Sequence, residues 1–437
     1  MSTEIDHSHE SSAQSWVASA NQPGSEFPIQ NLPLGVFSCG SSPFGKIGIA
    51  IGDQILDVGA ALDEGLLPGL KEWSAALRAD SLNLLMSRGA PARRALRYAA
   101  FSLLHVDSPK VAAAAECLVP MSEARVRLPA QIGDFTDFFT SAHHVRRSLE
   151  LLRPEAPVAP NFLNMPIAYH GRASTVVESG VPCVRPRGQV APPANGAAQY
   201  VPTQRLDFEL EVGCYVGGGN PIGKTIALDD AESHMFGLSL VNDWSARDVQ
   251  FWEGFPLGPF LSKSFMTTVS PWVVTMEALA PFRVPAPARG PEAPPLSPTL
   301  TSARHAASGG ISISLQVLLQ TQAMHEQGIE PTVLAQPQFA DQYWTLAQML
   351  THHTSNGCNL RSGDLLSSGT VSGPDRMDSG CLVESTSGGK QPRQLPSGES
   401  RVFLEDGDTV WLRGTCHREG YRSIGFGECK GQIVKAE

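Results

Sequence analysis

The N-terminal part of the chain shows short apolar runs that are typical of strands. Residues 35–38 and 47–57 have this pattern, and Gly52-Asp53 lies between two apolar stretches, where a hairpin turn is expected. Residues 60–105, rich in alanine, leucine and arginine, are typical of helices. We expect these elements to form one unit over residues 26–128.

Strand patterns dominate the rest of the chain. Residues 207–212 alternate charged and apolar side chains with period two, and residues 238–241 and 311–319 are further apolar runs of strand length. These runs predict one large β-rich unit over residues 129–437. The expected fold class is therefore mostly β with some helix, that is, α+β.

One helix is predicted inside this second unit. Apolar residues recur at helical spacing from Phe339 to Leu350, and Asn356-Gly357 is a typical helix end. The proline-rich residues 281–299 are interpreted as a stiff surface excursion, because strand patterns resume after them.

Composition narrows the class of protein. The chain has 437 residues and a net charge of −10, which argues against a nucleic-acid groove. It contains no apolar stretch of about 18 residues, so no membrane span is expected. Residues 1–25 are polar and lack the pattern of a signal peptide, and we expect a disordered tail. Eight cysteines without a CxxC motif indicate a reduced, cytoplasmic protein.

Carboxylates are the first candidates for chemistry. On a strand Asp207, Glu209 and Glu211 would share one face, where their charges repel unless water or a cation compensates them. One interpretation is a solvated sheet edge, and the other is an oxygen-ligand site for Mg²⁺ or Ca²⁺. Further acids at strand ends are Asp137 and Asp243, and Lys263 lies in an otherwise apolar segment.

Two histidine pairs are further candidates. His143 and His144 lie on a predicted helix, where adjacent residues diverge by about 100°, so only one of them can face a site. His352-His353 lies near the end of the helix predicted from Phe339, where a histidine favours the helix dipole, and a structural role is expected.

A third motif is Gly218-Gly219-Asn220-Pro221-Ile222-Gly223-Lys224-Thr225, which fits the phosphate-binding pattern GxxxxGK[ST]. A phosphate loop needs a helix that begins at its Lys-Thr pair, whereas Ile226-Ala227-Leu228 intervenes here and Asp229 is the expected N-cap. Nucleotide binding is therefore only a remote alternative.

Six further segments are distinctive, at residues 27–33, 133–138, 169–174, 241–248, 256–261 and 356–361. These segments resemble the fumarylacetoacetase family, within the fumarylacetoacetate hydrolase superfamily. The resemblance extends from about residue 27 to 433. It implies a small SH3-like N-terminal barrel, a large mixed β-roll catalytic domain and a homodimer.

The resemblance also implies roles for individual residues. The metal ligands would be Asp137, Glu209, Glu211 and Asp243, with Lys263 and Thr267 at a second cation site through backbone carbonyls. The catalytic groups would be His144, Glu384, Arg247, Gln250 and Lys263. The substrate contacts would be Phe139, Arg153, Tyr169, Gln250, Gly254 and Thr370, of which Arg153 matches by spacing only.

The implied reaction is hydrolysis of the carbon–carbon bond of 4-fumarylacetoacetate, a β-diketo acid, to fumarate and acetoacetate. This is the last step of tyrosine and phenylalanine breakdown. A neutral histidine would take a proton from water, and Mg²⁺ or Ca²⁺ would polarise the carbonyl. Phe139 and Gly254 replace tyrosines of the family, which leaves open an acylpyruvate-type hydrolase or a decarboxylase of the same superfamily. A non-catalytic cation-binding module is a further alternative.

Overall fold

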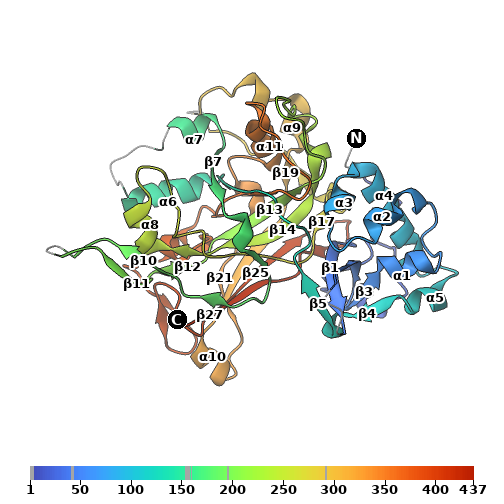
Figure 1. Ribbon diagram of the computed structural model, residues 1–437, viewed down its shortest axis with the longest axis horizontal. Coiled ribbons are helices and arrows are strands. Elements are labelled where there is room, and N and C mark those ends of the chain that lie inside the picture. The colour runs from blue at the N-terminus through green and yellow to red at the C-terminus, as the bar shows by residue number, and fades with distance from the viewer. Residues whose placement is uncertain (1–3, 41–43, 153–157, 159, 194–195, 291–292) are drawn as a thin grey trace.

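The computed structural model describes residues 4–40, 44–152, 158, 160–193, 196–290 and 293–437. It contains a small N-terminal unit and a large C-terminal unit, each built from sheets and helices (Figure 1). The predicted mixture of strand and helix in two such units is confirmed. The boundary near residue 128 stays a prediction.

The N-terminal unit is a five-stranded antiparallel sheet with helices packed against it (Figure 1). The strands are β1 (Leu34–Cys39), β2 (Lys46–Ile51), β3 (Gln54–Asp57), β4 (Leu118–Pro120) and β5 (Ala124–Arg127), and the sheet order is β4-β3-β2-β1-β5. The helices are α1 (Val58–Asp63), α2 (Ser74–Leu77), α3 (Asn83–Met86), α4 (Gly89–Leu104) and α5 (Val111–Ala115). The predicted hairpin is confirmed, since Gly52 has a φ of +58° between the paired residues Ile51 and Gln54.

The prediction of a disordered tail is wrong for residues 4–25. Short 3₁₀ helices form at His7–His9 and Ala18–Asn21, and Val17 and Ala20 are buried in the N-terminal core. Arg97 of α4 donates hydrogen bonds to Ser8 in this segment. The polar composition suggested that nothing could be buried, but a few small residues and one arginine anchor are enough.

The C-terminal unit contains two larger sheets. The first has eight strands: β7 (Ile167–Gly171), β6 (Phe135–Phe139), β22 (Leu365–Ser367), β13 (Leu210–Val216), β14 (Met235–Asp243), β16 (Thr267–Val269) and β8 (Val176–Glu178) in this order, with β17 (Val274–Thr275) paired to β14. The second has six: β21 (Thr332–Ala335), β20 (Ser314–Gln320), β25 (Thr409–Cys416), β27 (Cys429–Val434) and β9 (Cys183–Val184), with β26 (Ile424–Gly425) paired to β25. Parallel pairs such as β6–β22 make these sheets mixed.

Four strand pairs and seven helices are described around these sheets. The pairs are β10 (Arg187–Val190) with β11 (Gln199–Pro202), β12 (Leu206–Asp207) with β15 (Ser245–Ala246), β18 (Arg283–Val284) with β19 (Gly310–Ile311), and β23 (Arg393–Gln394) with β24 (Ser400–Arg401). The helices are α6 (Ala142–Leu152), α7 (Pro160–Asn164), α8 (Arg247–Glu253), α9 (Ala303–Ser308), α10 (Gln322–Glu326), α11 (Leu346–Thr354) and α12 (Leu382–Ser385). Among the described residues, no helix is long and apolar enough to cross a bilayer.

Two predicted elements are shorter than expected. The helix predicted from Phe339 begins only at Leu346, because Thr345 has an extended backbone and forms a capping box with Gln348. The run predicted as one strand over residues 311–319 is divided between β19 and β20.

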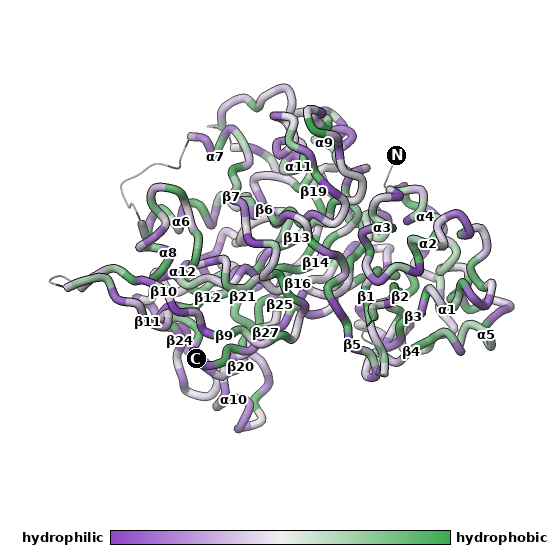
Figure 2. Tube along the Cα trace, in the orientation of Figure 1, coloured by the Kyte–Doolittle hydropathy of each residue, from purple (hydrophilic) through white to green (hydrophobic). Residues whose placement is uncertain are grey.

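Two apolar cores surround the first sheet of the C-terminal unit. One face packs against the second sheet, in a core that includes Leu210, Val212, Leu240, Leu315 and Leu412. The other face contributes Phe135, Tyr215, Val241 and Leu365 to the core of the N-terminal unit. Figure 2 shows apolar residues concentrated in these central strands. The alternation of strand side chains therefore fixes which residues can reach the site described next.

Candidate active site

Four carboxylates gather at one end of the first sheet. Asp137 lies on β6, Glu211 on β13 and Asp243 at the end of β14, and Glu209 immediately precedes β13. Each offers an oxygen atom within 4.8 Å of the others, and all four residues are buried. The prediction of a solvated edge is wrong, because β13 lies between β22 and β14 in the interior of the sheet.

The alternation along the strands places these acids on one face. Phe135, Tyr215 and Val241 pack toward the N-terminal unit, and Asp137, Glu211 and Asp243 lie two or four residues away on the same strands. The same sheet face is therefore apolar beneath the N-terminal unit and acidic beyond it.

Cationic and hydroxyl groups balance part of this charge. Lys263 donates a hydrogen bond to Asp243 at 3.1 Å and another to Glu209. Arg247 Nη1 donates to Glu209 at 2.7 Å, and Tyr169 and Thr267 donate to Asp243 at 2.6 and 2.8 Å. The predicted role of the Lys263 and Thr267 carbonyls at a second cation site stays a prediction.

Other oxygen atoms of the cluster are left without donors. Within the part of the chain that the structure describes, the buried atoms Asp137 Oδ1 and Glu211 Oε1 have no hydrogen-bond partner. Burial and the facing carboxylates raise the pKa of both groups well above its usual range. At Glu209 burial has the same tendency, but Lys263 and Arg247 outweigh it and lower the pKa. A hard divalent cation that prefers oxygen ligands fits this donor set.

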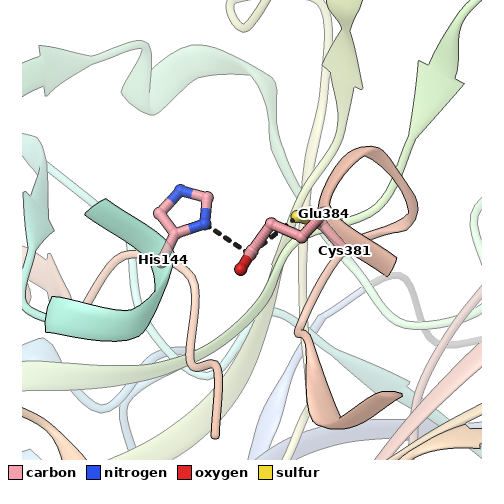
Figure 3. A group of neighbouring side chains, drawn as sticks. All are labelled: His144, Cys381 and Glu384. Carbon is pink, nitrogen blue, oxygen red and sulfur yellow. Dashed lines mark hydrogen bonds and ion pairs between the residues drawn. The ribbon is translucent and has the colours of Figure 1, made fainter. Parts of the chain in front are cut away.

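A histidine–carboxylate pair forms the second part of the site. His144 on α6 and Glu384 on α12 point toward each other, with His144 Nδ1 at 2.5 Å from Glu384 Oε1 (Figure 3). The other ring nitrogen points away from Glu384 in this view. When Nδ1 donates to the carboxylate, Nε2 is the nitrogen that can accept a proton from water.

Several groups fix Glu384. Ser372 Oγ and Cys381 Sγ donate to its Oε1 at 2.8 and 3.1 Å, and Arg147 Nη1 lies 3.4 Å from its Oε2. Burial alone would raise the pKa of Glu384, but the imidazole of His144 and these hydrogen bonds lower it to about 2. Glu384 is therefore an anion at neutral pH, as a partner for an imidazolium must be.

Of the predicted substrate contacts, Arg153 falls outside the described residues, and the other five are described. The ring of Phe139 lies edge-on to that of His144 at 5.0 Å, and Gln250 Oε1 accepts from Arg247 at 3.1 Å. Gly254 follows the last residue of α8. Within the described residues, the buried atoms Thr370 Oγ1 and Arg247 Nη2 have no partner and so remain available as donors to a ligand.

A glycine makes the position of Thr370 possible. Gly369 has a φ of +71°, and a Cβ at this residue would lie 2.0 Å from the carbonyl oxygen of Phe138. Only glycine lets the chain after β22 pass this close to β6.

The expected alignment of Asp207 with the other acids is wrong. The predicted strand is interrupted at Phe208-Glu209, so Asp207 belongs to β12 and faces Arg247 and the first residues of α12. The GxxxxGK[ST] segment has no helix at Lys224-Thr225, since residues 218–234 are described and the first helical turn there is Ala231–His234. The geometry needed for phosphate binding is therefore missing at this segment.

Two residues that contact the candidate site, Arg147 and Ser367, were missed by sequence reasoning, and the contacts of a third, Asp207, were not predicted. Arg147 follows His144 by three residues, and this helical spacing could have indicated a shared face. Ser367 donates to Glu211 but carries no charge pattern that distinguishes it from other serines. The contacts of Asp207 depend on chain segments 40 and 175 residues away, for which the sequence gives no signal.

The fold and the two groups of side chains define the class of protein. Residues 135–434 match the family described as Fumarylacetoacetate (FAA) hydrolase C-terminal, and residues 30–129 match Fumarylacetoacetase N-terminal. The fumarylacetoacetase of Oryza sativa is 46% identical over 95% of this chain and 96% of its own length. The human fumarylacetoacetase is 43% identical over 94% of this chain and 97% of its own length. The chain belongs to the fumarylacetoacetase family.

A solved structure agrees with the fold. A fumarylacetoacetate hydrolase from the psychrophilic Exiguobacterium antarcticum has a TM-score of 0.51 and 17% identity, and the match covers 93% of this chain and 100% of that one. At this identity the likeness concerns the fold alone. Proteins of this family depend on a metal, and the carboxylate cluster provides a candidate site for one.

Proposed function

We propose that this protein hydrolyses 4-fumarylacetoacetate to fumarate and acetoacetate, as the names of its relatives suggest. The observation that carries the proposal is the combination of two buried groups. One is the four-carboxylate cluster, in which two oxygens lack a partner among the described residues, and the other is the His144–Glu384 pair. Neither group alone specifies this reaction, but hydrolysis of a β-diketo acid needs both.

In this reaction water supplies a hydroxyl group to the fumaryl carbonyl carbon and a proton to the departing carbon. His144 accepts the proton of the attacking water at Nε2, and Glu384 stabilises the imidazolium that forms. Arg247 and Lys263 lie beside the acids and complement negative charge on the oxygens of the leaving enolate. Thr370 Oγ1 can donate a hydrogen bond that orients the substrate.

Asp137, Glu209, Glu211 and Asp243 would hold the metal, and we propose Mg²⁺ or Ca²⁺ on the basis of their all-oxygen donor set. When bound, such a cation polarises a carbonyl and offsets the charge of an enolate.

The test compares two substrates in parallel. Purified protein with Mg²⁺ should remove the ultraviolet absorption of the diketone in fumarylacetoacetate faster than that of an acylpyruvate. Chelation with EDTA should stop the reaction, and added Mg²⁺ should restore it. Faster turnover of the acylpyruvate would instead favour the related hydrolase activity, and no turnover of either would contradict the proposal.

We further propose that the protein acts as a homodimer. The end of α8 and the segment after it expose several large apolar side chains, namely Trp252, Phe255, Leu257, Phe260 and Leu261, and Leu257 is 97% exposed. Several large, exposed apolar side chains close together in the chain are typical of an interface. Light scattering should give twice the chain mass for the wild type and the chain mass for Leu257→Asp/Phe260→Asp. Ile222→Asp, at an isolated apolar residue that is 82% exposed, is the matched control.

A cytoplasmic location is also part of the proposal. All eight cysteines lie among the described residues and are free thiols there, as expected in a reducing compartment.

A further inference from the structure

Asp207 is a buried carboxylate outside the four-carboxylate cluster. Its side chain has no exposed surface, and its two oxygens accept four hydrogen bonds from the protein. Oδ1 accepts from the backbone amides of Phe208 and Leu382 at 2.9 and 2.7 Å. Oδ2 accepts from the Val383 amide at 2.9 Å and from Arg247 Nε at 3.0 Å. A carboxylate with this number of donors has one position and one orientation.

Two of these donors belong to the helix that carries Glu384. α12 has only four residues, and its N-cap residue, Cys381, makes no side-chain capping bond among the described residues. The amides of Leu382 and Val383 are the free donors at the start of such a helix. Asp207 accepts from both, so it acts as a cap from a distant part of the chain and fixes the turn from which Glu384 reaches His144.

The remaining side-chain donor connects Asp207 to the carboxylate cluster. Arg247 uses Nε for Asp207 and Nη1 for Glu209 and Gln250. Asp207 therefore holds the guanidinium in the orientation that leaves Nη2 without a partner among the described residues. Asp207 thus contacts Arg247, which binds the carboxylate cluster, and also α12, which carries Glu384.

We infer that Asp207 is a positioning residue that fixes the distance between the metal-binding carboxylates and the histidine base. This inference rests on the proposed function. Asp207 touches neither the substrate nor the reacting water, and it acts through Arg247 and α12. A displacement of about 1 Å between reacting groups costs on the order of 100-fold in rate, so the loss of this connection should lower turnover.

The test uses Asp207→Asn with Asp248→Asn as its control. An asparagine keeps the shape but turns an NH₂ group toward the Val383 amide and Arg247 if its oxygen stays on Leu382. Asp248 lies on α8 next to Arg247 and accepts from Gln204 N at 2.8 Å and from Val249 N at 3.0 Å, whereas its hydrogen bonds within the described residues do not include α12. Asp248 therefore anchors α8, as Asp207 does through Arg247, but it has no hydrogen bond to α12 among the described residues.

Two measurements separate positioning from general stability. In Asp207→Asn, kcat should fall on the order of 10- to 100-fold while KM changes less than about threefold. Hydrogen exchange should become faster in the peptide that contains Leu382 and Val383. In Asp248→Asn, kcat should stay within about twofold, and the exchange of that peptide should not change.

A failure of this inference can be distinguished from a failure of the proposed function. Hydrogen exchange needs no substrate, so it reports on α12 even if fumarylacetoacetate is not turned over. Unchanged kcat in Asp207→Asn, or an equal loss in both variants, would overturn the inference. If Asp207→Asn does not fold, Asp207→Glu keeps the charge and both acceptor oxygens. Its side chain is one methylene longer, so the carboxylate is displaced and kcat should fall on the order of 10- to 100-fold. An unchanged kcat together with unchanged exchange of α12 would contradict the role of Asp207.

Discussion

The protein buries charge in two regions in opposite ways. At the junction of the two units, Arg93 of α4 donates to Glu277 Oε1 at 2.9 Å and to the Met235 carbonyl at 3.1 Å. Arg97, one helical turn later, donates to the carbonyls of Gln30 and Asn31 at 2.6 and 2.8 Å. In the carboxylate cluster, by contrast, like charges face each other and two oxygens remain without donors among the described residues.

We interpret the hydrogen-bonded charges at the junction as structural, and the uncompensated charges of the carboxylate cluster as a ligand-binding site. Burial of a charged group costs several kcal/mol unless hydrogen bonds compensate it, and Arg93 and Arg97 meet that condition. The cluster does not meet it within the described part of the chain, so its folding cost is offset only when a ligand binds. Among the described residues, the buried carboxylate oxygens without a hydrogen-bond partner are Asp137 Oδ1 and Glu211 Oε1, both in the cluster. Unpartnered carboxylate oxygens therefore mark the site more clearly than burial or charge alone.

The largest effect is expected from Glu211→Gln. This change keeps the shape but removes one of the negative charges that would hold the metal, so kcat/KM should fall about 10⁴-fold, or about 5 kcal/mol. The metal-free protein should not become less stable, because repulsion with Asp137 and Asp243 is relieved. Steady-state kinetics at saturating Mg²⁺ and thermal melting in EDTA measure the two effects. Activity within about tenfold of the wild type would argue against a metal at this cluster.

The second prediction concerns the junction. Glu277→Gln leaves Arg93 buried without its counter-charge, which should lower the free energy of unfolding by about 3–5 kcal/mol. Turnover per folded molecule should stay near the wild-type value. Urea unfolding and kinetics on the same sample test this pattern, a loss of stability without a loss of turnover, which is the opposite of that expected for Glu211→Gln.

The matched control is Asp63→Asn. Asp63 pairs with Arg78 in the same unit, but its side chain is 69% exposed, so the stability should change by less than about 1 kcal/mol. A small effect of Glu277→Gln, comparable to this control, would show that the junction pair is not structural in the sense argued above.

The third prediction uses Glu384, a buried and hydrogen-bonded charge for which we propose a catalytic role. Its pKa of about 2 lies below the value near 4.3 of an unfolded chain, so its charge stabilises the fold above about pH 4.3. This contribution, about 3 kcal/mol, should be lost as the pH falls from about 4.3 to 2. Glu384→Gln lacks it, so the difference in unfolding free energy from the wild type should decrease over this range. Glu150→Gln, at an exposed residue, should follow the wild-type curve.

The sequence predicted local turns and strands better than it predicted contacts between distant segments. The turn at Gly52 and the strand around Leu238 follow from residue type and period, which are local properties. Thr345 shows the limit, since its capping box moved the start of a helix that periodicity alone placed earlier. Periodicity registers burial but not the hydrogen bonds that end an element.

Contacts between distant segments could not be derived from the pattern. His144 and Glu384 are 240 residues apart, and only the resemblance to a known family paired them. Alternation correctly placed Glu209 and Glu211 on one face, but it wrongly placed Asp207 with them. The interruption between β12 and β13 cannot be recognised from the alternation of polar and apolar residues, because the alternation continues across it. The same holds for the segment at residues 4–25, which Arg97 contacts from far along the chain through hydrogen bonds to Ser8.

The smallest predicted effect is the stabilisation by the cation itself. A ligand that binds only the folded protein adds about 2.7 kcal/mol at a concentration about 100 times its dissociation constant, so Mg²⁺ or Ca²⁺ should raise the melting temperature by several degrees. Glu211→Gln should abolish most of this increase, whereas Glu277→Gln should melt earlier but keep it. An equal increase in both variants would place the cation elsewhere. Burial of the unpartnered oxygens of Asp137 and Glu211 would then lower the stability of the fold, and no ligand would compensate it.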